Sequence, residues 1–186
     1  MKVRLHALER ASRANGPGLR AVVWFQGCTI GCPKCFNPET HDAAGGYAAE
    51  TNDIVEMLAA ARGEIDGVSI SGGEPFQQPE ALLDLVERLR ATGLSVLVFS
   101  GYPIDVIKAQ PLGPAILAHV DTLIAGPYVA GRHVGRALLG SSNQRVHLLS
   151  SRYGHRDFDR VPATEAVLHR DGTITLSGIQ PMRVLR

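Results

Sequence analysis

The chain is poor in the features that would place it outside the ordinary globular proteins. It has three cysteines, one tryptophan and 5% aromatic residues among 186 positions. No apolar run reaches the roughly 20 residues that a membrane-spanning helix needs, and no signal-peptide core follows the N-terminus. Lys and Arg number 19 against 18 Asp and Glu, so the overall charge favours neither nucleic acid nor an anionic membrane. From the length we expect one domain, residues 1–186. From the charge balance we expect that it binds neither nucleic acid nor a membrane.

All the cysteines lie in one short segment. Cys28, Cys32 and Cys35 have the spacing Cys-x3-Cys-x2-Cys and follow an apolar run over 21–25 that predicts a buried strand. An odd, clustered set argues against disulfides and for a reducing cytoplasm. Thiolates are soft ligands that favour iron–sulfur clusters, zinc or copper(I). Structural zinc sites and ordinary ferredoxin-type clusters use four protein ligands, so these cysteines leave one metal position for another kind of ligand.

A second motif, Ser-Ile-Ser-Gly-Gly-Glu-Pro over 69–75, stands between another apolar run and an amphipathic helix. We expect it to form a strand-to-helix turn. Gly72 and Gly73 would let a ligand approach the backbone, and Glu74 offers a carboxylate to an ammonium group, with Pro75 shaping the turn. The two motifs, each after a strand, predict one binding site.

Apolar runs alternate with amphipathic segments between residues 20 and 125. We expect strands at about 20–26, 66–71, 94–99 and 121–125, and helices at about 51–62, 79–92 and within 103–119. This alternation predicts parallel βαβ units of the α/β class. The carboxyl ends of parallel strands share one edge of a sheet, where both motifs and Ser100 would then lie.

The two ends of the chain give weaker patterns. Residues 1–19 are poorly periodic, and 129–160 reads as a polar loop region. Residues 141–144 are expected to start a capped helix or to form a partner-docking loop, and we favour docking. Residues 166–176 predict a β-hairpin with an Asp-Gly turn. Trp24 is expected to be a core residue.

At these motifs the chain resembles the radical S-adenosylmethionine (SAM) enzymes, and among them the anaerobic ribonucleotide reductase activating proteins. The resemblance covers about residues 15–147. The matching pieces are Asn15-Gly-Pro-Gly, Gly27-Cys28, Cys35-Phe36-Asn37, residues 69–75, Ser100-Gly-Tyr102 and residues 140–144. It implies a partial TIM-type β/α barrel with parallel strands, followed by a C-terminal extension, about 148–186, that contains the β-hairpin.

The resemblance also implies cofactors and site residues. Cys28, Cys32 and Cys35 would hold a 4Fe–4S cluster, whose remaining iron would bind SAM. The expected SAM contacts are Gly72, Gly73, Glu74 and Pro75 at the methionine end, Lys34 and Phe36 beside the adenosyl group, and Ser100 at the ribose. A low-potential donor such as flavodoxin or ferredoxin would supply one electron, and SAM would be cleaved to methionine and a 5′-deoxyadenosyl radical. The implied target is a partner glycyl-radical enzyme, such as an anaerobic ribonucleotide reductase.

Two departures leave alternatives open. The activating proteins tend to have an acidic residue and then glycine where this chain has Ala125-Gly-Pro, and many radical SAM enzymes have an apolar residue where Lys34 stands. A second hypothesis is therefore a radical SAM enzyme acting on a small molecule or peptide, with 129–186 as the substrate cover. A third is a non-catalytic zinc module with His41 as fourth ligand, which leaves the Gly-Gly-Glu-Pro turn unexplained.

Overall fold

The centre of the fold is a sheet of seven strands in the order β3-β1-β2-β4-β5-β6-β9, and the computed structural model describes residues 1–179. Four neighbouring strands run parallel: β2 (Arg20–Phe25), β4 (Gly67–Gly72), β5 (Ser95–Ser100) and β6 (Thr122–Ala125). Three flanking strands are antiparallel to their neighbours: β1 (Lys2–Ser12), β3 (Tyr47–Glu50) and β9 (Arg145–Leu148). The four expected strands and the α/β class are confirmed, and the open sheet agrees with a partial barrel.

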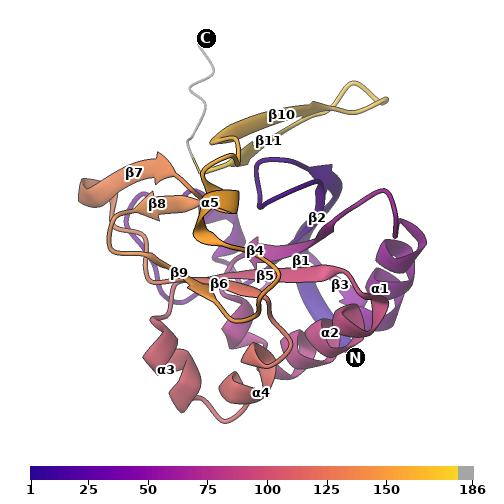
Figure 1. The fold of residues 1–186 in the computed structure, drawn as a ribbon, viewed down its shortest axis with the longest axis horizontal. Coiled ribbons are helices and arrows are strands. Elements are labelled where there is room, and N and C mark those ends of the chain that lie inside the picture. Colours follow the sequence, from indigo (N-terminus) through magenta and orange to yellow (C-terminus); the bar gives the residue numbers. More distant parts are fainter. Residues whose placement is uncertain (180–186) are drawn as a thin grey trace.

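The four larger helices lie together on one face of this sheet (Figure 1). They are α1 (Thr51–Ala60), α2 (Pro79–Thr92), α3 (Ile104–Ala109) and α4 (Gly113–Leu117). In α2 the residues at helical spacing, Leu82, Leu85, Val86 and Leu89, are fully buried against the sheet. The helix ends at Gly93, whose φ of 82° lies in the left-handed region that favours glycine. None of the helices in residues 1–179 combines the length and apolar character needed to cross a bilayer.

Apart from β9, the strands and the helix that follow β6 lie on the other side of the sheet (Figure 1). They include two small sheets, β7 (His133–Arg136) with β8 (Leu139–Ser141) and β10 (Thr164–Leu168) with β11 (Ile174–Gly178), and the helix α5 (His155–Phe158). The 3-10 helices are η1 (Pro38–Thr40), η2 (Pro75–Gln77) and η3 (Ala130–Arg132). The β10–β11 pair is the expected hairpin, and Gly172 adopts a φ of 85° in its Asp-Gly turn.

Five strands lie where the sequence predicts no regular element: β1, β3, β7, β8 and β9. β1 occupies most of the segment 1–19, and its pairing with β2 is interrupted by two register shifts. Such irregularities break the alternation of buried and exposed residues by which a strand is recognised. β9, within the expected loop region 129–160, is only four residues long and closes the sheet beside β6.

The segment 141–144 does not start a helix, because Ser141 ends β8 and a turn follows; docking by this segment stays a prediction. Ser141 is fully buried, and its hydroxyl accepts a hydrogen bond from the Val129 N–H at 3.1 Å. Gln144 Oε1 accepts from the Gly140 and Ser141 N–H groups, and its Nε2 donates to the Gly126 carbonyl. These polar residues are therefore used inside the molecule, where they fix the chain after β6.

Candidate active site

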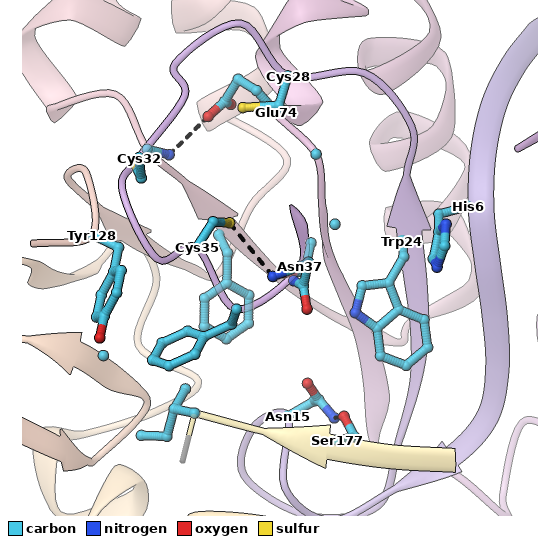
Figure 2. Close-up of a pocket in the computed structure, with 18 of the residues that line it drawn as sticks. His6, Asn15, Trp24, Cys28, Cys32, Cys35, Asn37, Glu74, Tyr128 and Ser177 are labelled. Atoms are coloured by element: carbon cyan, nitrogen blue, oxygen red, sulfur yellow. Dashed lines mark hydrogen bonds between the residues drawn. The ribbon is translucent and has the colours of Figure 1, made fainter. Parts of the chain in front are cut away.

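The carboxyl ends of β2, β4, β5 and β6 surround a cavity of about 430 Å³. Figure 2 shows the cysteines on one side of it, Trp24 and His6 on the other, and Asn15 with Ser177 below. Eight of the ten predicted site residues line it: Cys28, Cys32, Cys35, Phe36, Gly72, Gly73, Glu74 and Ser100. The other two do not. Lys34 is exposed with a φ of 61°, and Pro75 is buried in the turn behind the wall.

The cysteine loop is fixed at its base and carries free, half-buried thiols. The Gly27 and Cys28 N–H groups donate to the Thr40 and His41 carbonyls at 2.8 and 3.1 Å. Burial raises the pKa of the Cys28 and Cys35 thiols, against backbone hydrogen bonds that favour the thiolate. A bound cation would reverse this preference, because a coordinating thiol is deprotonated.

The donor set fits a cluster better than a single ion. Within residues 1–179, no three Cys, His, Asp or Glu side chains are grouped closely enough to hold one metal ion. A structural zinc site uses four protein ligands, and this loop supplies three thiols. Three thiols spread along one wall of a cavity suit a cluster, in which each cysteine binds a different iron. Cys28, Cys32 and Cys35 are thus the residues that would hold a 4Fe–4S group.

The double glycine is required by the packing of the turn against the cysteine-bearing strand. A Cβ on Gly72 would lie 2.4 Å from the Phe25 carbonyl oxygen, and one on Gly73 would lie 2.3 Å from that of Gly27. The N–H groups of Gly73 and Glu74 donate to these same two carbonyls at 2.8 and 2.9 Å. The glycines therefore fix the turn to the start of the cysteine loop. The Gly73 carbonyl accepts no hydrogen bond from residues 1–179 and remains available to a ligand.

The Glu74 carboxyl joins the end of β4 to the end of β5. It is 1% exposed, and its Oε1 accepts from the Phe76 N–H at 3.0 Å and the Ser100 hydroxyl at 2.9 Å. Its Oε2 accepts from the Gly101 N–H at 2.7 Å. Burial raises the pKa of Glu74 to about 7, although these three donors favour the ionised form. Most of its capacity to accept hydrogen bonds is therefore used within the protein.

Gln77 connects three strand ends, and sequence reasoning missed it. Its Oε1 accepts from the Thr29 N–H at 3.0 Å, next to the first cysteine. Its Nε2 donates to the Thr29 and Tyr102 hydroxyls, both at 2.8 Å. A single glutamine after the Gly-Gly-Glu-Pro turn carries no signal of this role, because both partners are distant in sequence.

The wall opposite the cysteines comes from β1, β2 and the C-terminal hairpin. Trp24 is half-buried and lines the cavity, so the expectation that it is a core residue is wrong. His6 Nδ1 lies 3.1 Å from Gln26 Oε1, and Asn15 Nδ2 donates to Ser177 Oγ at 2.6 Å. The hairpin thus covers one side of the cavity, a position that its sequence could not reveal.

Phe36 links the cysteine loop to the chain after β6. Its ring centroid lies 4.4 Å from that of Tyr128 and 5.9 Å from that of His133. A Cβ on Gly140 would lie 2.8 Å from the Phe36 ring, so β8 also packs closely on it. The loop that follows the cysteines is therefore held by aromatic contacts.

Comparison with known proteins agrees with this geometry. The 4Fe-4S single cluster domain family matches residues 14–147. The anaerobic ribonucleoside-triphosphate reductase-activating protein of Escherichia coli (strain K12) is 33% identical over 143 residues, which cover 73% of this chain and 92% of that protein. The chain belongs to this radical SAM family. As a member, it uses a 4Fe–4S cluster and SAM as its cofactors.

Other family relatives differ in length. The activating protein of Enterobacteria phage T4 is 30% identical over 71% of this chain and 85% of its own length. The pyruvate formate-lyase-activating enzyme of Clostridium pasteurianum is 33% identical over 63% of this chain, but the match spans only about half, 53%, of that enzyme. Among solved structures, QueE from Escherichia coli matches with a TM-score of 0.46 and 20% sequence identity. The match covers 54% of this chain and 53% of the QueE chain, and we base no argument on it.

Proposed function

We propose that this protein is an activating enzyme that generates a glycyl radical on a partner protein such as an anaerobic ribonucleotide reductase. The observation that supports it best is the meeting of the three cysteines and the Gly-Gly-Glu-Pro turn in one cavity at the ends of parallel strands. Relatives of similar length carry the name of that reductase's activating protein. Bound together, the cluster and SAM supply reductive cleavage to a 5′-deoxyadenosyl radical that removes a hydrogen atom.

The chain's own residues would bind and orient these groups. We assign the irons to Cys28, Cys32 and Cys35. We assign the methionine end of SAM to Gly72, Gly73 and Glu74, with the free Gly73 carbonyl as an acceptor for its ammonium group. Phe36 and Ser100 line the cavity where the adenosyl group would lie. Lys34 and Pro75 would not contact SAM, because neither lines the cavity.

The division of the chain follows from these roles. The core, about residues 15–147, would carry the cofactors, and the extension, about 148–186, would close the cavity on the target side within a single domain. Hydrogen abstraction needs no general acid or base. The protein instead needs to exclude water, and the hairpin wall formed by Leu176, Ser177 and Gly178 serves that purpose.

One observation favours a second candidate, a small-molecule or peptide substrate. The hairpin lines the cavity and lies outside the matched residues 14–147. A covered cavity could enclose a small substrate rather than admit a loop of a large protein.

Anaerobic reconstitution tests the proposal in two steps. The reconstituted protein, given dithionite and SAM, should release 5′-deoxyadenosine. Stable zinc binding without cleavage of SAM would instead support the hypothesis of a non-catalytic zinc module. The same protein should then produce an oxygen-sensitive glycyl radical signal when mixed with a candidate anaerobic ribonucleotide reductase. SAM cleavage without a radical on any candidate reductase would favour the small substrate.

A further inference from the structure

The region after β6 has a charge bias that the overall composition hides. Residues 122–156 contain five arginines, three histidines and no aspartate or glutamate, in a chain with 19 basic and 18 acidic residues. The cysteine loop shows the same bias, since Lys34 is the only charged residue between Gly27 and Pro38. Neither SAM binding nor the packing of the sheet explains a one-sided charge here.

Three of these eight basic residues lie in one short segment, residues 129–136, which contains η3 and β7 and is called the basic segment below. Arg132, His133 and Arg136 are exposed, and none of them is ion-paired within residues 1–179. Val129 and Val134 in the same segment are 38% and 37% exposed. Exposed valines in the same segment as unpaired arginines form a surface suited to a partner.

The basic segment touches the loop that would hold the cluster. The His133 ring packs edge-on against Phe36, with centroids 5.9 Å apart, and Phe36 directly follows the third cysteine. Lys34, on the other side of Cys35, is exposed as well. Figure 1 shows β7 at the outer edge of the molecule, on the side of the sheet away from the helices. A partner on this surface would therefore lie close to the cysteines without entering the cavity.

A protein that delivers an electron to the cluster needs a docking surface that is close to the cysteines but outside the cavity. It must approach the cluster, whose thiolate ligands add negative charge, while the cavity itself is filled by SAM and the target. Unpaired cations attract a partner of opposite charge and speed its association. Weak electron-transfer contacts are also among the smallest protein interfaces, at less than about 1,200 Å². A segment of eight residues with Lys34 is of a suitable size.

We propose that the basic segment, together with Lys34, docks the electron donor, a one-electron carrier protein with an acidic surface. The inference rests on the proposed function. The donor loses one electron per encounter, and that electron is consumed in breaking the sulfur–carbon bond of SAM to methionine and the 5′-deoxyadenosyl radical. The target protein would use the other side of the cavity, near the hairpin.

The test compares two variants with the same change in charge. The first is Arg132→Glu with Arg136→Glu, within the basic segment. The control is Arg62→Glu with Lys108→Glu, which are also exposed; Arg62 precedes β4, at the edge of the sheet opposite the cavity, and Lys108 lies in α3 on the helix side of the sheet. Binding of oxidised flavodoxin is measured by calorimetry at low and high salt. SAM cleavage is measured with reduced flavodoxin and, separately, with dithionite.

The basic-segment variant should bind flavodoxin at least about tenfold more weakly than the control variant, and the difference should shrink at high salt. Its flavodoxin-driven cleavage should fall in parallel, while dithionite-driven cleavage is unchanged. Equal loss with both reductants would show that the segment acts through the fold, and no loss with either would exclude docking; both outcomes overturn the proposal. Normal flavodoxin-driven cleavage with a lost radical on the reductase would assign the surface to the target instead. Absence of dithionite-driven cleavage in the wild type would count against the proposed function itself, a separate result.

Discussion

The rim of the cavity and the C-terminal extension are attached to the same sheet in different ways. At the rim, Glu74 and Gln77 each bond to groups on other strand ends, and the Gly72-Gly73 turn lies against the backbone of the cysteine-bearing strand. The extension begins with a buried contact, in which Phe158 packs beside Leu97 and Ile124, but its hairpin is joined to the rest by a few separate bonds. Tyr153 bonds to the buried Arg20, and Glu165 bonds to residues at the end of β1.

The difference indicates which part of the protein must be rigid. Cluster and SAM chemistry requires fixed distances, and a network in which each side chain has several partners provides them. A cover that meets a target must instead be able to open, and local opening costs least where contacts are few. The predictions below test this contrast, from the largest expected effect to the smallest.

Cys32→Ala should abolish cluster binding. The remaining two cysteines cannot hold three irons, so reconstituted protein should lose its iron, its visible absorbance and its cleavage of SAM. The thermal unfolding of the metal-free protein should hardly change, because the Cys32 thiol is half-buried and makes no hydrogen bond within residues 1–179. A variant with full iron content and activity would show that the ligand assignment is wrong.

Glu74 should make the stability of the metal-free protein depend on pH. Its pKa is raised from 4.5 to about 7, so the folded state binds the proton more tightly than the unfolded state. The stabilisation is complete below about pH 4.5 and is lost as the pH rises to about 7, a change of roughly 3 kcal/mol. Glu74→Gln should lack this loss in urea unfolding, and the exposed control Glu87→Gln should keep it. Equal pH slopes in the two variants would contradict the assignment.

Gly73→Ala should destabilise the fold by about 2–3 kcal/mol, because the added methyl group would overlap the Gly27 carbonyl. Gly131→Ala is the matched control, since nothing lies within 4 Å of a Cβ at that position. The control should be neutral or slightly stabilising. Urea midpoints measure both. A neutral Gly73→Ala would mean that the turn can move away from the cysteine loop, and that the rim is less rigid than its contacts suggest.

The parts of the fold that could be predicted from the sequence are those whose cause is local. The periodic apolar residues of α2 and its terminal glycine define that helix without any other part of the chain. The four parallel strands are likewise apolar runs between helices. Their order places both motifs at one edge, which is why eight of the ten predicted residues line the cavity.

What could not be predicted depends on distant contacts. Trp24 faces the cavity because one side of the sheet carries the binding site. The sequence of a strand does not show which of its two faces packs against the core and which lines a cavity. Glu165 and Ser12 are 153 positions apart, so the location of the hairpin depends on tertiary packing alone. The sequence predicts that the Gly-Gly pair leaves space for a ligand, whereas its close contact with the end of β2 is visible only in the structure.

Gln77→Leu should slow SAM cleavage by about tenfold. Loss of a side chain that orients metal ligands typically reduces activity by about 10- to 100-fold, and we expect an effect at the lower end of this range. The variant loses all three hydrogen bonds to Thr29 and Tyr102. Because Gln77 acts through the loop, the electron paramagnetic resonance spectrum of the reduced cluster should change as well. Tyr102→Phe removes only one of these bonds and should have a smaller effect. An unchanged spectrum with a lower rate would point to a role in SAM binding instead.

Glu165→Ala should loosen the hairpin while leaving the rim intact. The Glu165 carboxylate accepts from the Ser12 hydroxyl at 2.6 Å and the Arg13 N–H at 2.9 Å. Losing these charged hydrogen bonds lowers the free energy of local opening by about 1.5 kcal/mol, equivalent to roughly tenfold faster amide exchange. Hydrogen exchange should accelerate by that factor in β10 and β11 and stay constant in β4 and β5. The exposed control Glu56→Ala should change neither. Faster exchange in β4 and β5 as well would show that extension and rim open as one unit, and the contrast between them would not hold.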